Sequence, residues 1–185
     1  MQSLFLAYSL SGAAGVRSSW VMLVISILVK VGYIHPGASL AWMGTWWVIA
    51  LALVASIVDF IGDKVPVLDH LLHIVHIGLA PVVGALSAMT GYHGDPTAML
   101  ILGLLGGGNA LALHSARSGL RAVSTATTMG FGNIVISIIE DVLVTCFIIV
   151  AVLAPFLTAA LMVISTVWVF RKIGAAASAR RSNVA

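Results

Sequence analysis

The chain has 185 residues, of which 61% are hydrophobic and only 8% are charged. Because a soluble domain carries about 25% charged residues, this composition excludes an ordinary soluble enzyme and predicts an all-α integral membrane protein. The formal net charge of +3 is too small to indicate a nucleic-acid partner, and the single cysteine, Cys146, excludes an intramolecular disulfide.

Six apolar segments are long enough to cross a bilayer, which takes about twenty residues per helix. They are 3–31, 41–62, 66–90, 97–119, 130–153 and 155–172. The stretch SGAAGVRSS interrupts the first segment, and Trp42, Trp46 and Trp47 open the second as an interfacial aromatic belt would. We therefore predict one transmembrane domain over 1–172, followed by a flexible basic tail over 173–185.

The basic residues predict the orientation, because lysine and arginine accumulate on the cytoplasmic side of a membrane protein. Four of the nine lie in the last fifteen residues, as Arg171, Lys172, Arg180 and Arg181. With this end in the cytoplasm and six spans, Lys64, Arg117 and Arg121 also fall near the cytoplasmic side. Both termini are then expected to be cytoplasmic.

A short internal similarity raises the possibility of a repeat. SGAAGVRSS at 11–19 is similar to ARSGLRAVS at 116–124, and each is followed by a segment with acidic residues in its apolar run. Three spans in each half, 1–92 and 93–172, would form an inverted repeat, which is typical of transporters. Chance similarity between glycine-rich apolar segments is the alternative.

The segment from Ser56 to His76 is the most polar part of the apolar chain. It holds Asp59, Asp63, Lys64, Asp69, His70, His73 and His76. An ionisable side chain at bilayer depth is costly unless it is paired or hydrated, so such a cluster predicts a functional site.

Helical spacing places polar residues of several segments on single faces. Asp69, His73 and His76 share one stripe, and a second contains small residues followed by His114, Arg117 and Arg121. Ser137 and Asp141 lie on a third stripe, with Glu140 beside them. We expect these faces to turn toward one another and away from lipid.

Each of these patterns also has a purely structural interpretation. Asp63 and Lys64 could form a solvated interfacial pair, Arg117 and Arg121 could only set the orientation, and Glu140 and Asp141 could pair with Arg17 or Arg121. The small residues could serve helix packing or act as hinges that break helices. They are Gly12, Gly15, Gly106, Gly107 and Gly108.

Asp69, His73 and His76 could also bind a divalent metal ion, since nitrogen and oxygen ligands suit zinc, manganese or iron. The pattern HxxHxxH has little specificity. Proton transfer by the same side chains is an equal alternative, because histidine titrates near neutral pH.

Several motifs resemble a bacterial membrane family called domain of unknown function 4126. They are DKVPVLDHLLHIVH, Pro81, GGGNALALHSARSGLR and SIIEDVL, with Gly15 and Arg17 near the start of the family pattern. The matching positions include Asp63, Lys64, Asp69, His76, His114, Arg121, Glu140 and Asp141. His70 and His73 depart from the pattern, which weakens a three-histidine metal site. The resemblance implies a small bacterial inner-membrane protein, but it does not indicate a substrate.

The leading hypothesis is a small homo-oligomeric transporter or channel in the lipid bilayer. It would move a cation, either a proton or a divalent metal, or use protons to drive a small solute. Its expected pathway comprises Arg17, Asp59, Asp63, Lys64, Asp69, His76, His114, Arg121, Glu140 and Asp141. The alternatives are an intramembrane enzyme acting on lipid, although no nucleophile motif such as GxSxG occurs, and a structural subunit.

Overall fold

All regular structure in residues 1–182, the part of the chain that the computed structural model describes, is helical. Side chains are described except for 66, 67, 69, 70, 169, 170 and 172–182. The elements are α1 (Gln2–Ala13), α2 (Ser18–Lys30), the 3₁₀ helix η1 (Ala38–Gly44), α3 (Trp46–Gly62), α4 (Pro66–Thr90), α5 (Pro96–Thr128), α6 (Phe131–Leu153) and α7 (Pro155–Ser182).

Three helical segments of this described part are long and apolar enough to cross a membrane: 71–90 of α4, all of α5, and all of α6. The count rises to four if η1 and α3, which meet at a 58° bend, form one span. The apolar stretches of α2 and α7 are shorter. The all-helical prediction is confirmed, whereas the predicted six spans are not.

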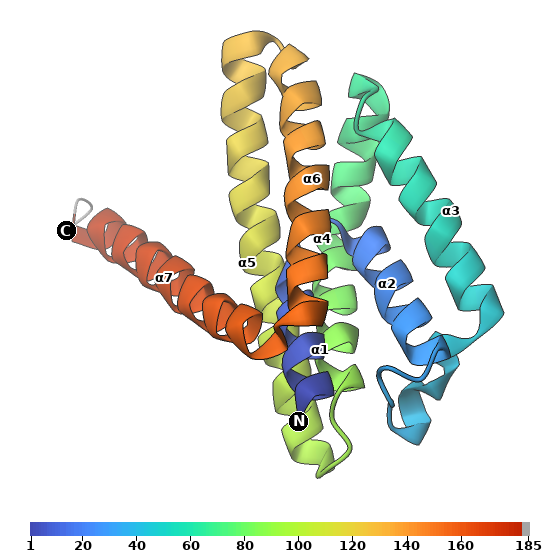
Figure 1. Cartoon of the computed structure of the whole chain (residues 1–185). Helices are drawn as coiled ribbons and strands as arrows, with labels where there is room; N and C mark the ends of the chain where they lie inside the picture. Colours follow the sequence, from blue (N-terminus) through green and yellow to red (C-terminus); the bar gives the residue numbers. More distant parts are fainter. Residues whose placement is uncertain (183–185) are drawn as a thin grey trace.

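The predicted first span forms a hairpin of two short helices. The backbone of Ser3 in α1 packs against Gly91 at the end of α4, and Lys30 at the end of α2 lies 4.8 Å from the ring of Trp46, where α3 begins. Both ends of the hairpin therefore lie at the same end of the molecule, and its tip lies inside the helix bundle (Figure 1).

This hairpin supplies much of the hydrophobic core. Leu6 and Leu10 of α1 and Val21 and Ile25 of α2 are fully buried. The larger apolar residues of the surrounding helices face outward instead: Leu51, Leu104 and Leu143 are each more than 60% exposed. Large exposed apolar surfaces around buried polar groups are the arrangement expected of a protein in lipid.

Glycines allow α4 and α5 to pack with their backbones close together. A Cβ at Gly106 would collide with the backbone of Gly84, and one at Gly107 would press on the carbonyl of Pro81. Gly106, Gly107 and Gly108 lie in an unbroken helix, so this run serves packing, and the predicted break does not occur there.

The chain does break near Gly12 and Gly15, at the tip of the hairpin. A Cβ at Gly15 would overlap the carbonyl of Ala110 in α5, and one at Gly12 would overlap the side chain of Met162 in α7. The two similar stretches thus differ in structure, because 11–19 contains this break whereas 116–124 is continuous helix. The inverted repeat is not confirmed.

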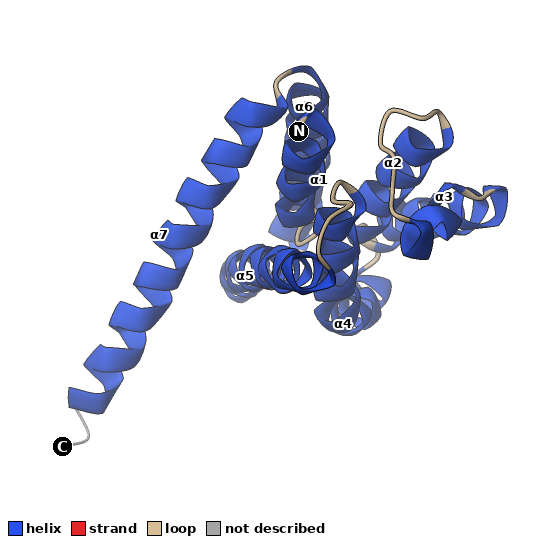
Figure 2. Cartoon of the chain, turned by 90° about the horizontal axis from the view of Figure 1, so that it is seen from below, coloured by secondary structure: helices blue, strands red, loops and turns tan. Residues whose placement is uncertain are grey.

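The first turns of the last helix, α7, pack against the bundle. Thr158 donates to Ser9 at 3.0 Å, and Thr166 donates to Asn109 at 2.6 Å. Beyond this point α7 projects away from the other helices in both views (Figures 1 and 2). The side chains of the predicted basic tail, 173–185, lie outside the described residues.

Candidate functional site

Arg17 lies at the tip of the hairpin, where it begins α2 with a non-helical backbone conformation (φ −139°, ψ 77°). Its side chain is buried and forms ion pairs with Asp63 and Asp141, the latter at 2.7 Å. It also donates to the hydroxyl of Ser137 at 2.9 Å. The break after α1 therefore places a guanidinium group in the interior, where α3 and α6 supply its partners.

Asp63, directly after α3, is the centre of the ion-pair network. Its Oδ2 atom accepts contacts from Arg17, from Arg117 at 3.1 Å and from Arg121 at 3.5 Å. Burial by itself would raise the pKa of this carboxyl, but the three guanidinium groups outweigh burial and hold the pKa below its ordinary value.

Glu140 links the same network to α6. Nε of Arg117 donates to Glu140 Oε2 at 2.9 Å, and Arg121 donates to the same oxygen at 3.0 Å. Arg117 and Arg121 stand one helical turn apart on α5, so their side chains project from the same face of the helix. Both contact the carboxylates of Asp63 and Glu140. The network joins the hairpin tip, the end of α3, α5 and α6.

Asp59 and His76 form a second polar group one turn below Asp63. His76 Nδ1 lies 2.8 Å from the carbonyl of Leu72, which can only accept, so this nitrogen carries a hydrogen. Its Nε2 lies 3.2 Å from Asp59 Oδ2, which also accepts from Ser19. The histidine–carboxylate contact therefore requires one further proton, on either Nε2 or Asp59.

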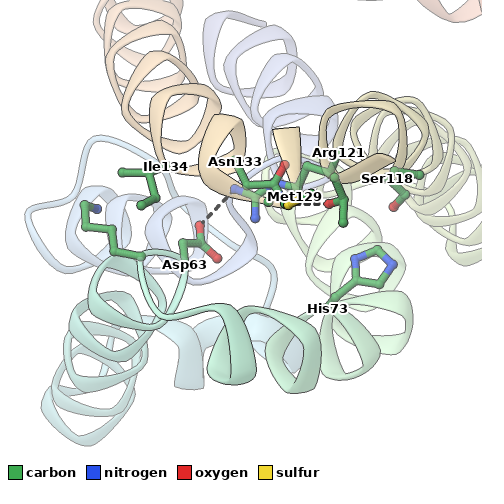
Figure 3. Close-up of a pocket in the computed structure, with 11 residues that line it drawn as sticks. Asp63, His73, Ser118, Arg121, Met129, Asn133 and Ile134 are labelled. Carbon is green, nitrogen blue, oxygen red and sulfur yellow. Dashed lines mark hydrogen bonds and ion pairs between the residues drawn. The ribbon is translucent and has the colours of Figure 1, made fainter. Parts of the chain in front are cut away.

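A cavity of about 330 Å³ opens beside Asp63 at the end of the molecule that contains the α5–α6 turn. Lys64, Arg121 and His73 also line it, and Figure 3 shows Asp63, Arg121 and His73 around it. The ring of His73 stacks on that of buried His114, with centroids 5.1 Å apart. The buried network is thus in contact with a polar cavity.

The structure brings together most of the predicted pathway residues. Arg17, Asp63, Arg121, Glu140 and Asp141 belong to the network, and Lys64 approaches it, 3.7 Å from Asp141. Asp59 with His76, and His114 with His73, lie in separate side-chain contacts. The side chain of Asp69 lies outside the described residues.

Two members of the network were absent from the predicted site. Arg117 was interpreted as a possible orientation signal, yet it contacts both Asp63 and Glu140. Ser137 contacts Arg17. Both lie on the predicted polar stripes, so the 3.6-residue period was the signal that could have included them.

The structure does not confirm the proposed metal ligands. Within the described residues, no group of three or more histidine, cysteine, aspartate or glutamate side chains could hold a metal ion. His73 faces His114, whereas His76 faces Asp59. Since the side chain of Asp69 is not among those described, the full set of ligands stays a prediction.

The fold and the site define a class of small helical proteins with helices of membrane-spanning length around a buried network of charges. The chain belongs to the family described as domain of unknown function (DUF4126), whose model matches residues 4–174. The resemblance seen in the sequence is thereby confirmed. Comparisons with curated proteins and with solved structures found no match.

Proposed function

We propose that this chain is a small transporter of the bacterial inner membrane that uses protons to drive a small solute. The observation that carries this proposal is the convergence of Arg17, Asp63, Arg117, Arg121 and Glu140, from four segments, beside a polar cavity. Charges inside a membrane protein are costly, and they commonly mark ion pathways and proton relays.

Protonation would change the partners within this network. Adding a proton to Glu140 removes the negative charge that Arg117 and Arg121 share. Arg121 would keep its contact with Asp63 at 3.5 Å but lose that negative charge, so it would attract an additional acceptor from the cavity that it lines. A solute entering the cavity can supply that acceptor, which couples its binding to protonation.

The same geometry favours proton coupling over transport of a divalent metal. Asp63, Glu140 and Asp141 each contact at least one guanidinium group. A divalent cation at these carboxylates would be repelled by the guanidinium groups that already contact them. A proton can bind to one oxygen and leave the helices in place. The Asp59–His76 pair, whose Oδ2 and Nε2 atoms lie 3.2 Å apart, would act as a second exchange site.

The arrangement of helices also supports a proposal for the orientation of the termini. We propose that α3 to α6 cross the membrane and that the α1–α2 hairpin enters and leaves at one face. The end with Lys64 would be cytoplasmic, as the basic residues favour, whereas α7 begins at the opposite end (Figure 1), where Tyr33 donates to the carbonyl of Val152 at the end of α6. The N-terminus would then lie on the opposite face, contrary to the expectation that both termini are cytoplasmic.

The test measures proton flux in vesicles that contain the purified full chain and an internal pH-sensitive dye. Amino acids, organic acids, alkylamines and divalent metals are added in turn outside. We expect at least one solute to drive proton movement, and Glu140→Gln to abolish it. The matched control is Asp95→Asn, because Asp95 caps α5 at the opposite end and asparagine caps helices equally well.

The proposal would be contradicted if no solute drove proton movement in vesicles whose protein is folded and monodisperse. Equal flux in the Glu140→Gln and Asp95→Asn variants would contradict the role of the network.

A structural subunit is the second candidate, and one observation favours it. Each carboxylate of the network is paired with arginine, as in a static ion-pair cluster. For this candidate, Glu140→Gln would lower thermal stability while no solute moved protons in the wild type.

A further inference from the structure

A second cavity, of about 480 Å³, lies between α2, α3 and α6. Its walls are mostly apolar and include Trp20, Ile57 and Phe60. Its charged lining residues are Arg17, Asp59 and Asp141. This volume lies within the range of small-molecule sites, which are usually apolar with a few placed polar groups.

This lateral cavity is reached from the lipid-facing surface. Ile57, Phe60 and Ile61, which line it, are each at least half exposed on the outer side of α3. A ligand that dissolves in the apolar part of a membrane can therefore enter sideways, without passing through the polar cavity near Asp63.

An ammonium group, that of Lys64, lies next to two residues that line this cavity, Phe60 and Asp141. The Nζ atom of Lys64 donates to the carbonyl of Phe60 at 2.7 Å and lies 3.5 Å from the centroid of the Phe60 ring. It also lies 3.7 Å from Oδ2 of Asp141. A carbonyl, a carboxylate and an aromatic face together form a site suited to a primary ammonium ion.

The charge of the lining residues also favours a cationic ligand. Two carboxylates, Asp59 and Asp141, line the cavity with one guanidinium group, that of Arg17. Arg17 is shared with Asp63, which lies outside this cavity. Oδ2 of Asp141 is buried and makes no hydrogen bond to any described residue, so it can accept one from a ligand.

We propose that the lateral cavity binds amphiphilic primary ammonium compounds, whose charged group replaces the Lys64 ammonium between Phe60 and Asp141. The apolar part of the ligand then packs against Trp20 and Ile57. Lys64 is long and partly exposed, so it can withdraw to the surface when the ligand enters. The binding site stands independently of transport, whereas its role as a substrate site rests on the proposed function.

The experiment measures binding of 4-phenylbutylammonium to the purified full chain in detergent, by titration calorimetry. We expect Lys64→Met to tighten binding about tenfold, because a tethered competing cation is removed. The matched control is Lys30→Met, since Lys30 also lies over an aromatic ring, that of Trp46, but at the opposite end of the molecule. Its affinity should equal that of the wild type.

Two further measurements define the site. Asp141→Asn should weaken binding about tenfold, since it removes the ligand's counter-charge. If this variant does not fold, Phe60→Leu serves instead, and loss of the aromatic face should weaken binding about threefold. The neutral analogue 4-phenylbutanol should bind much more weakly than the amine.

Equal binding of the alcohol and the amine would show that the cavity accepts any apolar molecule, including a lipid chain, and would overturn the inference. Unchanged affinity in Lys64→Met would overturn it as well. Because binding is measured without a membrane gradient, its failure is distinct from an absence of proton flux.

Discussion

Three buried arginine side chains have Asp63 as a counter-ion. The Asp63 carboxylate contacts all three guanidinium groups, and two of them belong to successive turns of α5. An asparagine at this position has nearly the same size but lacks the charge, so the arginines would lose a counter-ion without any change in packing.

We expect Asp63→Asn to lower the free energy of unfolding by about 3–5 kcal/mol, the range for removing one partner of a buried ion pair. The measurement is thermal or denaturant unfolding in detergent. Asp95→Asn, at an exposed helix start, provides the comparison, and an equal loss in both variants would show that the network does not stabilise the fold.

The lowered pKa of Asp63 also predicts a pH dependence. Because the folded pKa lies below the unfolded value of about 3.9, the carboxylate contributes its stabilisation above the unfolded pKa. That contribution is lost as the pH falls through the folded pKa. The unfolding temperature of the wild type should therefore fall more steeply below about pH 4 than that of Asp63→Asn. Parallel profiles would contradict this prediction.

Several charged residues of the site could be predicted from the sequence, because helical spacing shows which of them share a face. Helical spacing predicts Arg121 and Glu140 in a common interior, and the structure pairs them at 3.0 Å. The sequence could not pair Arg17 with Asp63, since that contact depends on where the hairpin ends. Arg117 was missed because a cation near a helix end is equally expected from orientation alone.

At the scale of elements, the hairpin tip packs its backbone against that of α5. Gly15 lies against the carbonyl of Ala110, and backbone atoms cannot move aside as a flexible side chain can. Gly119, in the same helix α5, has open space around it. Substitution by alanine should therefore change the stability of the protein in opposite directions at Gly15 and Gly119.

We expect Gly15→Ala to destabilise the protein, by about 1–3 kcal/mol as for other overpacked sites. Gly119→Ala should stabilise it by up to about 1 kcal/mol, because alanine favours the helix interior more than glycine does. Unfolding of both variants in the same detergent tests the prediction. A stabilising effect at Gly15 would show that the tip is not packed against α5.

The sequence indicated that the first apolar segment is interrupted, but not that the chain turns back. A run of membrane length has the same composition whether its two halves are collinear or antiparallel. The direction of α2 is decided by its contacts with α3 and η1, such as that of Lys30 with Trp46. For a similar reason, the glycine run 106–108 could not be assigned to packing until Gly84 was placed opposite it.

At the scale of the whole molecule, the hairpin predicts which exposed positions share a side of the membrane. Tyr33 follows α2, His93 lies between α4 and α5, and Met129 lies in the turn before α6. In a Cys146→Ser background, single cysteines at 33 and 93 should react with an impermeant reagent from the same side as an N-terminal tag. A cysteine at 129 should react from the other side.

Labelling of position 33 from the side opposite the N-terminal tag would show that 3–31 crosses the membrane, as the six-span prediction requires. Equal labelling of all positions would indicate leaky vesicles, which a tagged soluble marker inside them detects.

The position of α1 and α2 also determines the sequence of events in biogenesis. These helices leave the ribosome first, yet they occupy the middle of a bundle whose other members are made later. Arg17 is synthesised 46 residues before Asp63 and 120 residues before Ser137. Until those groups arrive, its charge has no partner in the interior. With the membrane topology that we propose, the hairpin would therefore wait near the bilayer surface and move into place only after α6 has been inserted.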